Sequence, residues 1–292
     1  MNRSHVQSML ETARVFVGEG KALHAIQLYR RIQEQEPLTI ESYLRLATLF
    51  SDQGQLGSAE RVLRCGLRRR PRNPDLLLLL GDLLVREGRY RQAVTYYSRL
   101  RRSNRPGIHL RLGLAHFRDG DLGAAEEELR AAVRHNPSLP KVHDLLGEIL
   151  LQRGKPEPAI AELRRAIRHD PYSGTAHRLL GTALMETHRI VEAHEEFLVA
   201  VDVNPEDSAA WQLCGETLIR MRQYADAEYY LKRALALDPT SADATTSLGY
   251  LSIQKGDVVK ALEAFDAALK IQPGHVRALD GKLHLRIFSR QS

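Results

Sequence analysis

Three histidines recur at equal spacing and could, by residue type, coordinate a transition metal. His109, His143 and His177 lie 34 residues apart, and imidazole nitrogen is a common ligand of zinc. If each histidine lies on a helix of its own, neighbouring axes are ~8–10 Å apart, whereas all ligands of one zinc ion lie within about 2.1 Å of it. The spacing therefore predicts no shared metal site, and nothing else in the sequence indicates a cofactor.

A dense run of arginines between residues 61 and 105 could bind phosphate or another anion. The segment holds thirteen arginines against only Asp75, Asp82 and Glu87. Guanidinium groups bind phosphate oxygens through a fixed fork of N–H donors, so such a band attracts polyanions. Because no aromatic residues interleave with the arginines outside expected core positions, the pattern favours a solvated outer face over single-strand binding. The candidate residues of this band are Arg61, Arg64, Arg68, Arg69, Arg70, Arg101 and Arg102.

No group of residues has the spacing of a catalytic site. The sequence contains no nucleophile motif and no pair of carboxylates in a predicted cleft, and Gly18 and Gly20 lack the preceding strand of a dinucleotide-binding loop. The two cysteines, Cys65 and Cys214, are too far apart in the chain to indicate a disulfide framework or a cysteine metal site. We therefore expect that the protein is not an enzyme.

Small residues recur along the whole chain with a period of 34 residues. Alanine occupies positions 25, 59, 93, 125, 159, 193, 227 and 261, and only the interval from Ala93 to Ala125 is shorter, at 32. A second series, which begins with Ala13 and Ala47 and continues as glycine, runs twelve residues ahead of these alanines. A period of this length predicts a solenoid built from repeated helical units.

Each unit has the pattern of two helices. In residues 140–173, apolar residues at helical spacing predict one helix before Gly154 and another after it. The second helix must end before Pro171, because proline has no amide hydrogen and excludes its predecessor from the helical region. Gly147 and Ala159 lie where the two antiparallel helices approach, and a larger side chain there would push the helix axes apart.

Two turns and one joint depart from the pattern. Glycine usually occupies the turn between the two helices, but His188 and Arg222 take its place in two units, which predicts strained or differently built turns. Around Pro106 the spacing is shortened, so the next first helix must begin close to Gly107. This joint predicts either a local change of superhelix pitch, with a hinge as one form of it, or a short loop of no consequence.

The pattern resembles the tetratricopeptide repeat family. The resemblance consists of a small residue at position 8, alanine at 20, an aromatic residue or leucine at 24 and proline at 32. It implies an all-α fold, a right-handed α-solenoid of eight helix-turn-helix repeats with a C-terminal capping helix. The solenoid would span 6–275, followed by the capping helix and tail at 276–292, with repeats at 6–39, 40–73, 74–105, 106–139, 140–173, 174–207, 208–241 and 242–275.

Residues 276–290 have the composition of a terminal helix. Val276, Leu279, Leu283 and Ile287 share one face, and we expect this face to cover the last apolar edge of the solenoid. A helix that lies on a membrane surface is the alternative interpretation.

The resemblance also implies a binding surface, the concave groove lined by first helices, with positions 2, 5, 9 and 12 facing it. Position 5 is leucine in the first four repeats and mostly polar in the last four. An exposed apolar strip is typical of a binding surface, while packing between neighbouring first helices explains the same leucines equally well. The candidate groove residues are Leu10, Arg14, Leu44, Leu78, Asp82, Leu110, Phe117, Arg118, Lys141, Asp144, Arg178 and Gln212.

These observations predict a protein-interaction scaffold or adaptor whose partner is another protein, bound as a peptide or an amphipathic helix. The alternative is a module that binds nucleic acid or another polyanion through the band at 61–105. That band lies in the half of the chain that carries the excess of positive charge, because residues 1–139 contain 23 Lys and Arg against 15 Asp and Glu. The first ten residues have no apolar signal core and no apolar run approaches ~18 residues, so we expect a cytoplasmic protein without membrane insertion.

Overall fold

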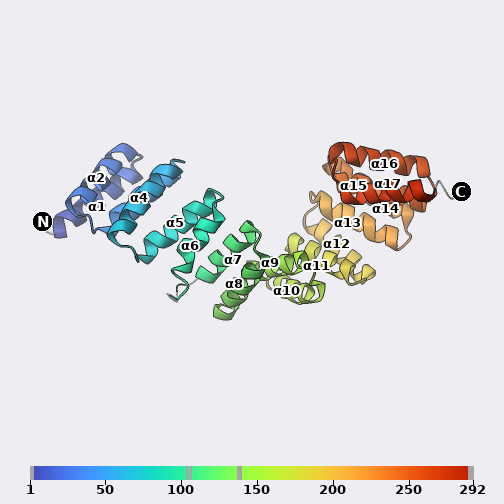
Figure 1. The fold of residues 1–292 in the computed structure, drawn as a ribbon, viewed down its shortest axis with the longest axis horizontal. Coiled ribbons are helices and arrows are strands. Elements are labelled where there is room, and N and C mark those ends of the chain that lie inside the picture. Colours follow the sequence, from blue (N-terminus) through green and yellow to red (C-terminus); the bar gives the residue numbers. More distant parts are fainter. Residues whose placement is uncertain (1–2, 103–104, 106, 137–139, 289–292) are drawn as a thin grey trace. The chain divides into compact units, whose positions relative to one another are not determined.

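The computed structural model of the protein describes residues 3–102, 105, 107–136 and 140–288, and within them it contains seventeen α-helices and no strand (Figure 1). The helices alternate along the chain between first and second members of successive pairs. The first helices are α1 (Arg3–Gly18), α3 (Ile40–Asp52), α5 (Pro74–Arg86), α7 (Ile108–Asp119), α9 (Pro140–Gln152), α11 (Gly174–Glu186), α13 (Ser208–Arg220) and α15 (Ala242–Gln254). The second helices are α2 (Ala22–Gln35), α4 (Leu56–Arg69), α6 (Tyr90–Ser98), α8 (Leu122–His135), α10 (Pro156–His169), α12 (Ile190–Val203), α14 (Tyr224–Leu237) and α16 (Val258–Ile271), and α17 (Val276–Phe288) follows the last pair.

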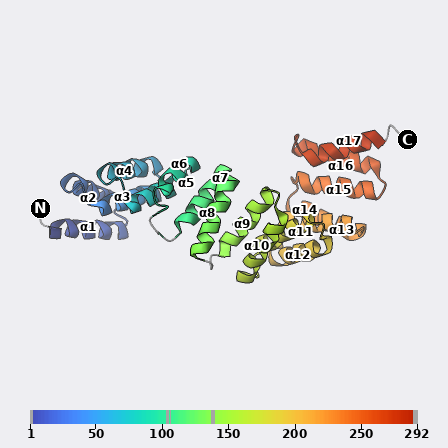
Figure 2. The ribbon, with the colours of Figure 1, turned by 60° about the horizontal axis from the view of Figure 1, so that its bottom comes forward.

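The helices form two compact units, residues 1–137 with α1 to α8 and residues 138–292 with α9 to α17. Within each unit a first helix packs against the second helix of its own pair, and that second helix packs against the next first helix (Figure 2). First helices of neighbouring pairs also contact each other, as α3 does with α5 and α13 with α15. We call the surface that these first helices form, together with α17 in the second unit, the first-helix face.

Close approach of the two helices within a pair explains the series of small residues. A Cβ atom placed on Gly147 would lie 2.4 Å from Cγ of Leu163, and one on Gly81 would lie 2.3 Å from Cε1 of Tyr97. Carbon atoms in favourable contact are ~3.5–4.0 Å apart, so neither position has room for a side chain. The prediction that these positions must be small is confirmed. Similar contacts occur at Gly113, Gly181, Gly215 and Gly249.

The turns at His188 and Arg222 have the same geometry as the turns that contain glycine. Both residues adopt φ 61°, in the left-handed region, where Gly54 has φ 74°. His188 N–H donates to Met185 O at 3.1 Å, as Gly54 N–H donates to Ser51 O at 3.1 Å. Of the two interpretations that the sequence left open, the structure therefore supports strain, because left-handed backbone is costly for a residue with a side chain.

The irregular joint shortens the third pair. The second helix α6 has 9 residues, whereas α8 has 14. Gly107 precedes α7 with φ 77°, and α7 begins at Ile108, close to the predicted position. Residues 103, 104 and 106 lie outside the described residues. The division between the two compact units falls at residues 137 and 138, one pair beyond this joint.

The predicted packing face of the terminal helix is wrong. Val276, Leu279 and Leu283 are 67%, 47% and 58% exposed. The helix packs on α16 through a narrower face that contains fully buried Ala278 and Gly281, where a Cβ atom would lie 2.5 Å from Cζ of Phe265. Leu285, which is 8% exposed, belongs to the same buried face, whereas Val276, Leu279 and Leu283 lie on other faces of the helix. Among the described residues, no helix combines the length and apolarity that crossing a bilayer requires.

Candidate functional site

The first-helix face of the first unit contains an open hollow between α3 and α5. One part has a volume of about 420 Å³ and is lined by Ile40, Glu41, Leu44, Arg45, Thr48, Asn73 and Asp75. A second part of about 540 Å³ is lined by Leu38, Ile40, Arg70, Pro71, Arg72 and Asn73. Both parts are bordered by Ile40 and Asn73, and we call the two together the α3–α5 hollow. It contains Leu44, one of the leucines that the sequence proposed for the groove.

The start of α5 is fixed by local capping, which places one wall of the hollow. The Asn73 side chain accepts hydrogen bonds from the backbone N–H groups of Asp75 and Leu76, at 3.1 and 3.0 Å. Pro74 occupies the first turn, where its missing N–H group costs no hydrogen bond. The apolar part of the lining is partly open to solvent, since Leu38 is 55% exposed. Leu38, Ile40 and Asn73 lie at helix starts and turns, which the helix-face pattern could not identify.

The acidic groups of the α3–α5 hollow are already paired. Glu41 accepts hydrogen bonds from Arg14 of α1 and from Arg45, the latter at 3.4 Å. The Arg14 hydrogen bond is the main reason that the pKa of Glu41 lies below its ordinary value. Asp75 forms an ion pair with Arg105 at 2.7 Å. The exposed arginines of the rim, Arg70 and Arg72, have no ion pair among the described residues, so this edge of the hollow carries net positive charge.

The other predicted residues of the front half lie outside the hollow. Leu10 is 3% exposed and belongs to the core, and Leu78 and Leu110 are partly buried. Asp82 accepts hydrogen bonds from the Tyr97 hydroxyl at 2.5 Å and from Arg111 Nε at 2.9 Å, so it braces α5, α6 and α7. Burial is the main cause that raises the pKa of Tyr97, and its bond to Asp82 adds to the shift. Phe117 is partly buried and Arg118 is exposed on α7.

The first-helix face of the second unit contains a smaller hollow of about 230 Å³. Its walls come from α13, α15 and α17, which we call the α13–α17 hollow. Glu216 and Tyr250 occupy position 9 of their repeats, so the groove pattern could have identified both. Arg220 at the rim is exposed and forms no ion pair among the described residues. The lining residues are Glu216, Ile219, Arg220, Ser247, Tyr250, Gln254 and Arg277.

A hydrogen-bond network holds the polar side chains of the α13–α17 hollow in place. Gln212 Nε2 donates to Ser247 Oγ at 3.2 Å, and Ser247 Oγ donates to Glu216 Oε1 at 2.7 Å. Glu216, whose side chain is 10% exposed, also forms an ion pair with Arg277. The Tyr250 hydroxyl donates to Arg277 O at 2.9 Å, and the Arg277 guanidinium lies 5.7 Å from the Tyr250 ring centre. The network joins α13, α15 and α17 and holds the buried Glu216 carboxylate beside the exposed guanidinium groups of Arg220 and Arg277.

The predicted rear-groove residues differ in accessibility. Gln212 is 6% exposed and serves the network, while Lys141 is exposed. Arg178 Nε donates to Asp207 Oδ2 at 3.0 Å, which links α11 to the start of α13. Asp144 has a buried Oδ1 without a hydrogen-bond partner among the described residues. Its pKa is raised mainly by burial and further by nearby Asp170.

Intramolecular ion pairs engage five of the thirteen arginines of the band, Arg64, Arg89, Arg91, Arg101 and Arg105. Arg91 Nε lies 2.9 Å from Asp119 Oδ2, and Arg101 lies 2.8 Å from Glu128. Glu60 serves both Arg64 at 2.7 Å and Arg89 at 2.8 Å. The carboxylates that pair with these arginines lie mainly on neighbouring pairs of helices, outside the segment 61–105 in which the charges were counted. The other eight arginines of the band are exposed and form no ion pair within the described residues, namely Arg61, Arg68, Arg69, Arg70, Arg72, Arg86, Arg99 and Arg102.

The periodic histidines link the two helices of a pair. Each Nδ1 lies within hydrogen-bond distance of a glutamate carboxylate on the second helix, 2.7 Å for His109 and Glu128, and 2.6 Å for His177 and Glu196. His143 makes the same contact with Glu162 at 2.8 Å. The Glu196 hydrogen bond is the main cause that raises the pKa of His177. Among the described residues, no three metal-ligating side chains lie together.

The geometry defines an all-α helical-repeat protein, and comparison with known proteins identifies the family. Two tetratricopeptide repeat models match the chain, one at residues 44–90, 78–140 and 215–276 and the other at residues 150–216. The chain therefore belongs to the tetratricopeptide repeat family, as the sequence pattern indicated. Members of this family are typically non-catalytic scaffolds that bind other proteins or peptides.

Solved structures with the same fold have low sequence identity to the chain. The chain of the APC/C hetero-tetramer Cut9–Hcn1 is 17% identical with a TM-score of 0.62, and the match covers 98% of this chain but 57% of that one. A tetratricopeptide repeat protein from Parabacteroides merdae is 17% identical with a TM-score of 0.66, covering 85% and 98%. MamA from Desulfovibrio magneticus is 20% identical with a TM-score of 0.53, covering 59% and 98%. No curated protein matches the chain.

Proposed function

We propose that the protein is a scaffold that binds a segment of a partner protein, peptide or amphipathic helix, on the first-helix face. The α3–α5 hollow is the observation that carries this proposal. Its two parts, about 420 and 540 Å³, are large enough to receive apolar side chains of a partner, and their apolar lining comes from Ile40 in both parts, Leu38 in the larger and Leu44 in the smaller. A helix or extended segment can place apolar anchors there, which is a common mode of peptide recognition.

Charge adds specificity to this surface. Arg70 and Arg72 lie at one edge of the hollow without ion pairs among the described residues, so an acidic group beside the apolar anchors of the partner is favoured. Because Glu41 is paired with Arg14, its carboxylate repels an acidic partner group less than a free carboxylate would. The α13–α17 hollow offers a second, polar surface of the same kind in the other unit.

The alternative, polyanion binding through the whole arginine band, has less support. Five of its arginines form ion pairs with carboxylates of the protein itself. A polyanion would have to compete with these carboxylates. We therefore place the partner segment on the first-helix face.

A random peptide library tests the proposal without knowledge of the natural partner. Peptides selected on the wild-type protein are expected to bind at the α3–α5 hollow, so Leu44→Glu weakens them at least about tenfold, the usual effect of losing a central apolar anchor. The readout is the dissociation constant from fluorescence anisotropy, and thermal unfolding confirms that the variant is folded.

Leu23→Glu is the matched control for this experiment. Leu23 is a leucine of α2 that is 75% exposed and outside the hollow, so the same change of charge should leave peptide affinity as it is. Selected peptides that bind wild type and Leu44→Glu equally well would refute the proposed surface. Unfolding of Leu44→Glu would show instead that Leu44 belongs to the core.

A further inference from the structure

A separate cavity lies on the second helices of the first unit. It has a volume of about 360 Å³ and is lined by Arg64, Leu67, Arg68, Tyr96 and Arg99. The lining residues come from α4 and from the end of α6, so the cavity shares no residue with the α3–α5 hollow. Three of them are cations and none is acidic. This composition differs from the α3–α5 hollow, where Glu41 and Asp75 balance part of the charge.

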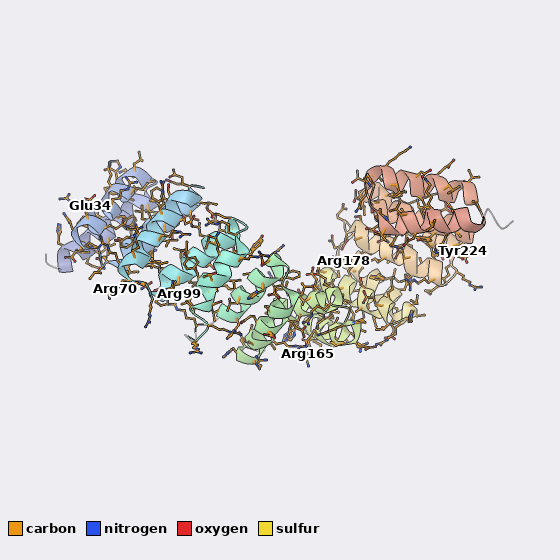
Figure 3. All side chains as sticks on the ribbon, in the orientation of Figure 1. Glu34, Arg70, Arg99, Arg165, Arg178 and Tyr224 are labelled. Carbon is orange, nitrogen blue, oxygen red and sulfur yellow. The ribbon has the colours of Figure 1, made fainter. Side chains whose placement is uncertain are left out.

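The positive charge of this cavity is only partly neutralised by the protein. Arg64 pairs with Glu60 at 2.7 Å, but Glu60 also accepts hydrogen bonds from Arg89. Arg99, which is labelled in Figure 3, donates to the backbone oxygen of Pro71, an uncharged acceptor. Arg68 is exposed and forms no ion pair among the described residues. Of the three guanidinium groups of the cavity, only that of Arg64 has a carboxylate partner, which it shares with Arg89, and an added anion would lower their mutual repulsion.

The repeat register shows that this arginine set is not a general property of the fold. In the preceding joint the positions of Arg64 and Arg68 are Arg30 and Glu34, and the position of Arg99 is Cys65. A face that only needs solvation does not require three arginines at one joint. In the second unit, Arg164 and Arg168 occupy the positions of Arg64 and Arg68. Glu196 and Val199 occupy the positions of Tyr96 and Arg99.

We propose that this cavity, which we call the α4–α6 cavity, binds a phosphorylated side chain of a partner protein. A phosphoryl group carries about −1.5 to −2 charge and three acceptor oxygens, which match several guanidinium forks better than a single carboxylate does. Recognition of phosphorylated motifs by arginine clusters is a general mode of peptide binding. The half-buried Tyr96 and the 8% exposed Leu67 form the uncharged wall.

The size of the cavity favours a single side chain over a polymer. A volume of about 360 Å³ holds one phosphorylated residue, whereas a nucleic acid contacts a long row of cations. Of the neighbouring arginines, Arg91 and Arg101 are held by Asp119 and Glu128. Exposed Arg69 and Arg102 form no ion pair among the described residues and do not line the cavity. The occupant is therefore a discrete phosphate on a protein chain.

Binding of a defined phosphopeptide tests this proposal. The probe is acetyl-Gly-Gly-phosphoserine-Gly-Gly-amide, and the readout is the shift of arginine Nε–Hε resonances in the full chain. We expect the resonances of Arg64, Arg68 and Arg99 to shift together. The same peptide with glutamate in place of phosphoserine, and inorganic phosphate alone, should each bind at least about tenfold more weakly.

Two charge reversals at equivalent positions separate a local site from general attraction. Arg68→Glu should weaken the phosphopeptide at least about tenfold, because it removes a fork and adds repulsion. Arg168→Glu changes an exposed arginine at the same repeat position in the other unit and should leave the affinity unchanged. Leu44→Glu should also leave it unchanged, since the α3–α5 hollow is a different surface. Circular dichroism checks that each variant is folded, and Arg68→Ala replaces Arg68→Glu if the latter is not.

Four results would overturn the proposal. An equal loss in Arg68→Glu and Arg168→Glu would show non-specific attraction. Equal affinity for inorganic phosphate and phosphopeptide would show a simple ion site. Tighter binding of a single-stranded oligonucleotide, with the loss spread evenly over all arginines of the band, would show a polyanion surface. Absence of any resonance shift would show that the α4–α6 cavity does not bind phosphate.

Discussion

Gly147→Ala tests whether the close approach of paired helices explains the small residues of the repeat. The added Cβ would lie 2.4 Å from Cγ and 2.5 Å from Cδ2 of Leu163. Because Cγ is the branch point of the leucine and not its flexible end, the clash requires the helices to move, at a cost of about 2–3 kcal/mol. Alanine recovers about 0.8–1.0 kcal/mol over glycine within a helix. The expected net loss of unfolding free energy is therefore about 1–2 kcal/mol.

The sign of this effect should reverse when Leu163 is shortened. Leu163→Ala alone costs about 2–5 kcal/mol, but it also removes the clashing atoms, so Gly147→Ala in that background should stabilise by about 1 kcal/mol. Gly174→Ala is the control, because Gly174 lies in the same unit and a Cβ there comes no closer than 3.5 Å to any neighbouring atom. Urea unfolding can be followed through Trp211, the single tryptophan, which lies in the same unit as Gly147. Stabilisation by Gly147→Ala in the wild-type background would refute the reasoning.

Three further predictions concern backbone strain and buried charge. Replacing His188 or Arg222 with glycine relieves the strain of the left-handed backbone, so each change should raise the unfolding free energy by about 0.5–1 kcal/mol in urea titrations. A lower unfolding free energy would show that these two turns are not strained. Because the Glu196 hydrogen bond raises the pKa of His177, its stabilising effect is full below the unfolded-state pKa of ~6.5 and is lost as the pH rises through the folded-state pKa. The stability difference between wild type and His177→Gln should therefore shrink between about pH 6 and 8, and a difference that grows would exclude this linkage. The raised pKa of Asp144 means that folding disfavours its charged form, so Asp144→Asn should raise the thermal unfolding midpoint at neutral pH. This gain in midpoint should vanish near about pH 3, where the wild-type carboxyl is protonated in both the folded and the unfolded state. A lowered midpoint at pH 7 would show that the charge stabilises the fold.

The sequence predicted the fold well because the repeat pattern records a local steric requirement. Gly147 and Leu163 meet within one pair of helices, so a single spacing of 16 residues carries the signal, and it recurs along the chain. Left-handed turns are equally local, and the sequence identified His188 and Arg222 as exceptions. In contrast, α17 has no second helix of its own, so the repeat gives no register for its packing face, and hydrophobicity alone indicated the wrong one.

The candidate site was only partly predictable, because exposure and charge pairing depend on neighbouring helices. Leu10 and Leu44 occupy the same repeat position, yet Leu10 is core and Leu44 lines a hollow. Similarly, the charge count within 61–105 overstated the free positive charge. Arg91 and Arg101 find their carboxylates on α7 and α8, outside the counted segment. Such contacts join residues about one repeat apart, and only the packed structure shows which ones meet.

Resonance mapping of a library-selected peptide on the full chain tests the central claim most directly, that the first-helix face holds the partner segment. If the partner segment binds there, the amide resonances that shift belong to residues 38–48 and 70–75, which surround the α3–α5 hollow. Shifts confined to the second helices, with these residues unchanged, would contradict it.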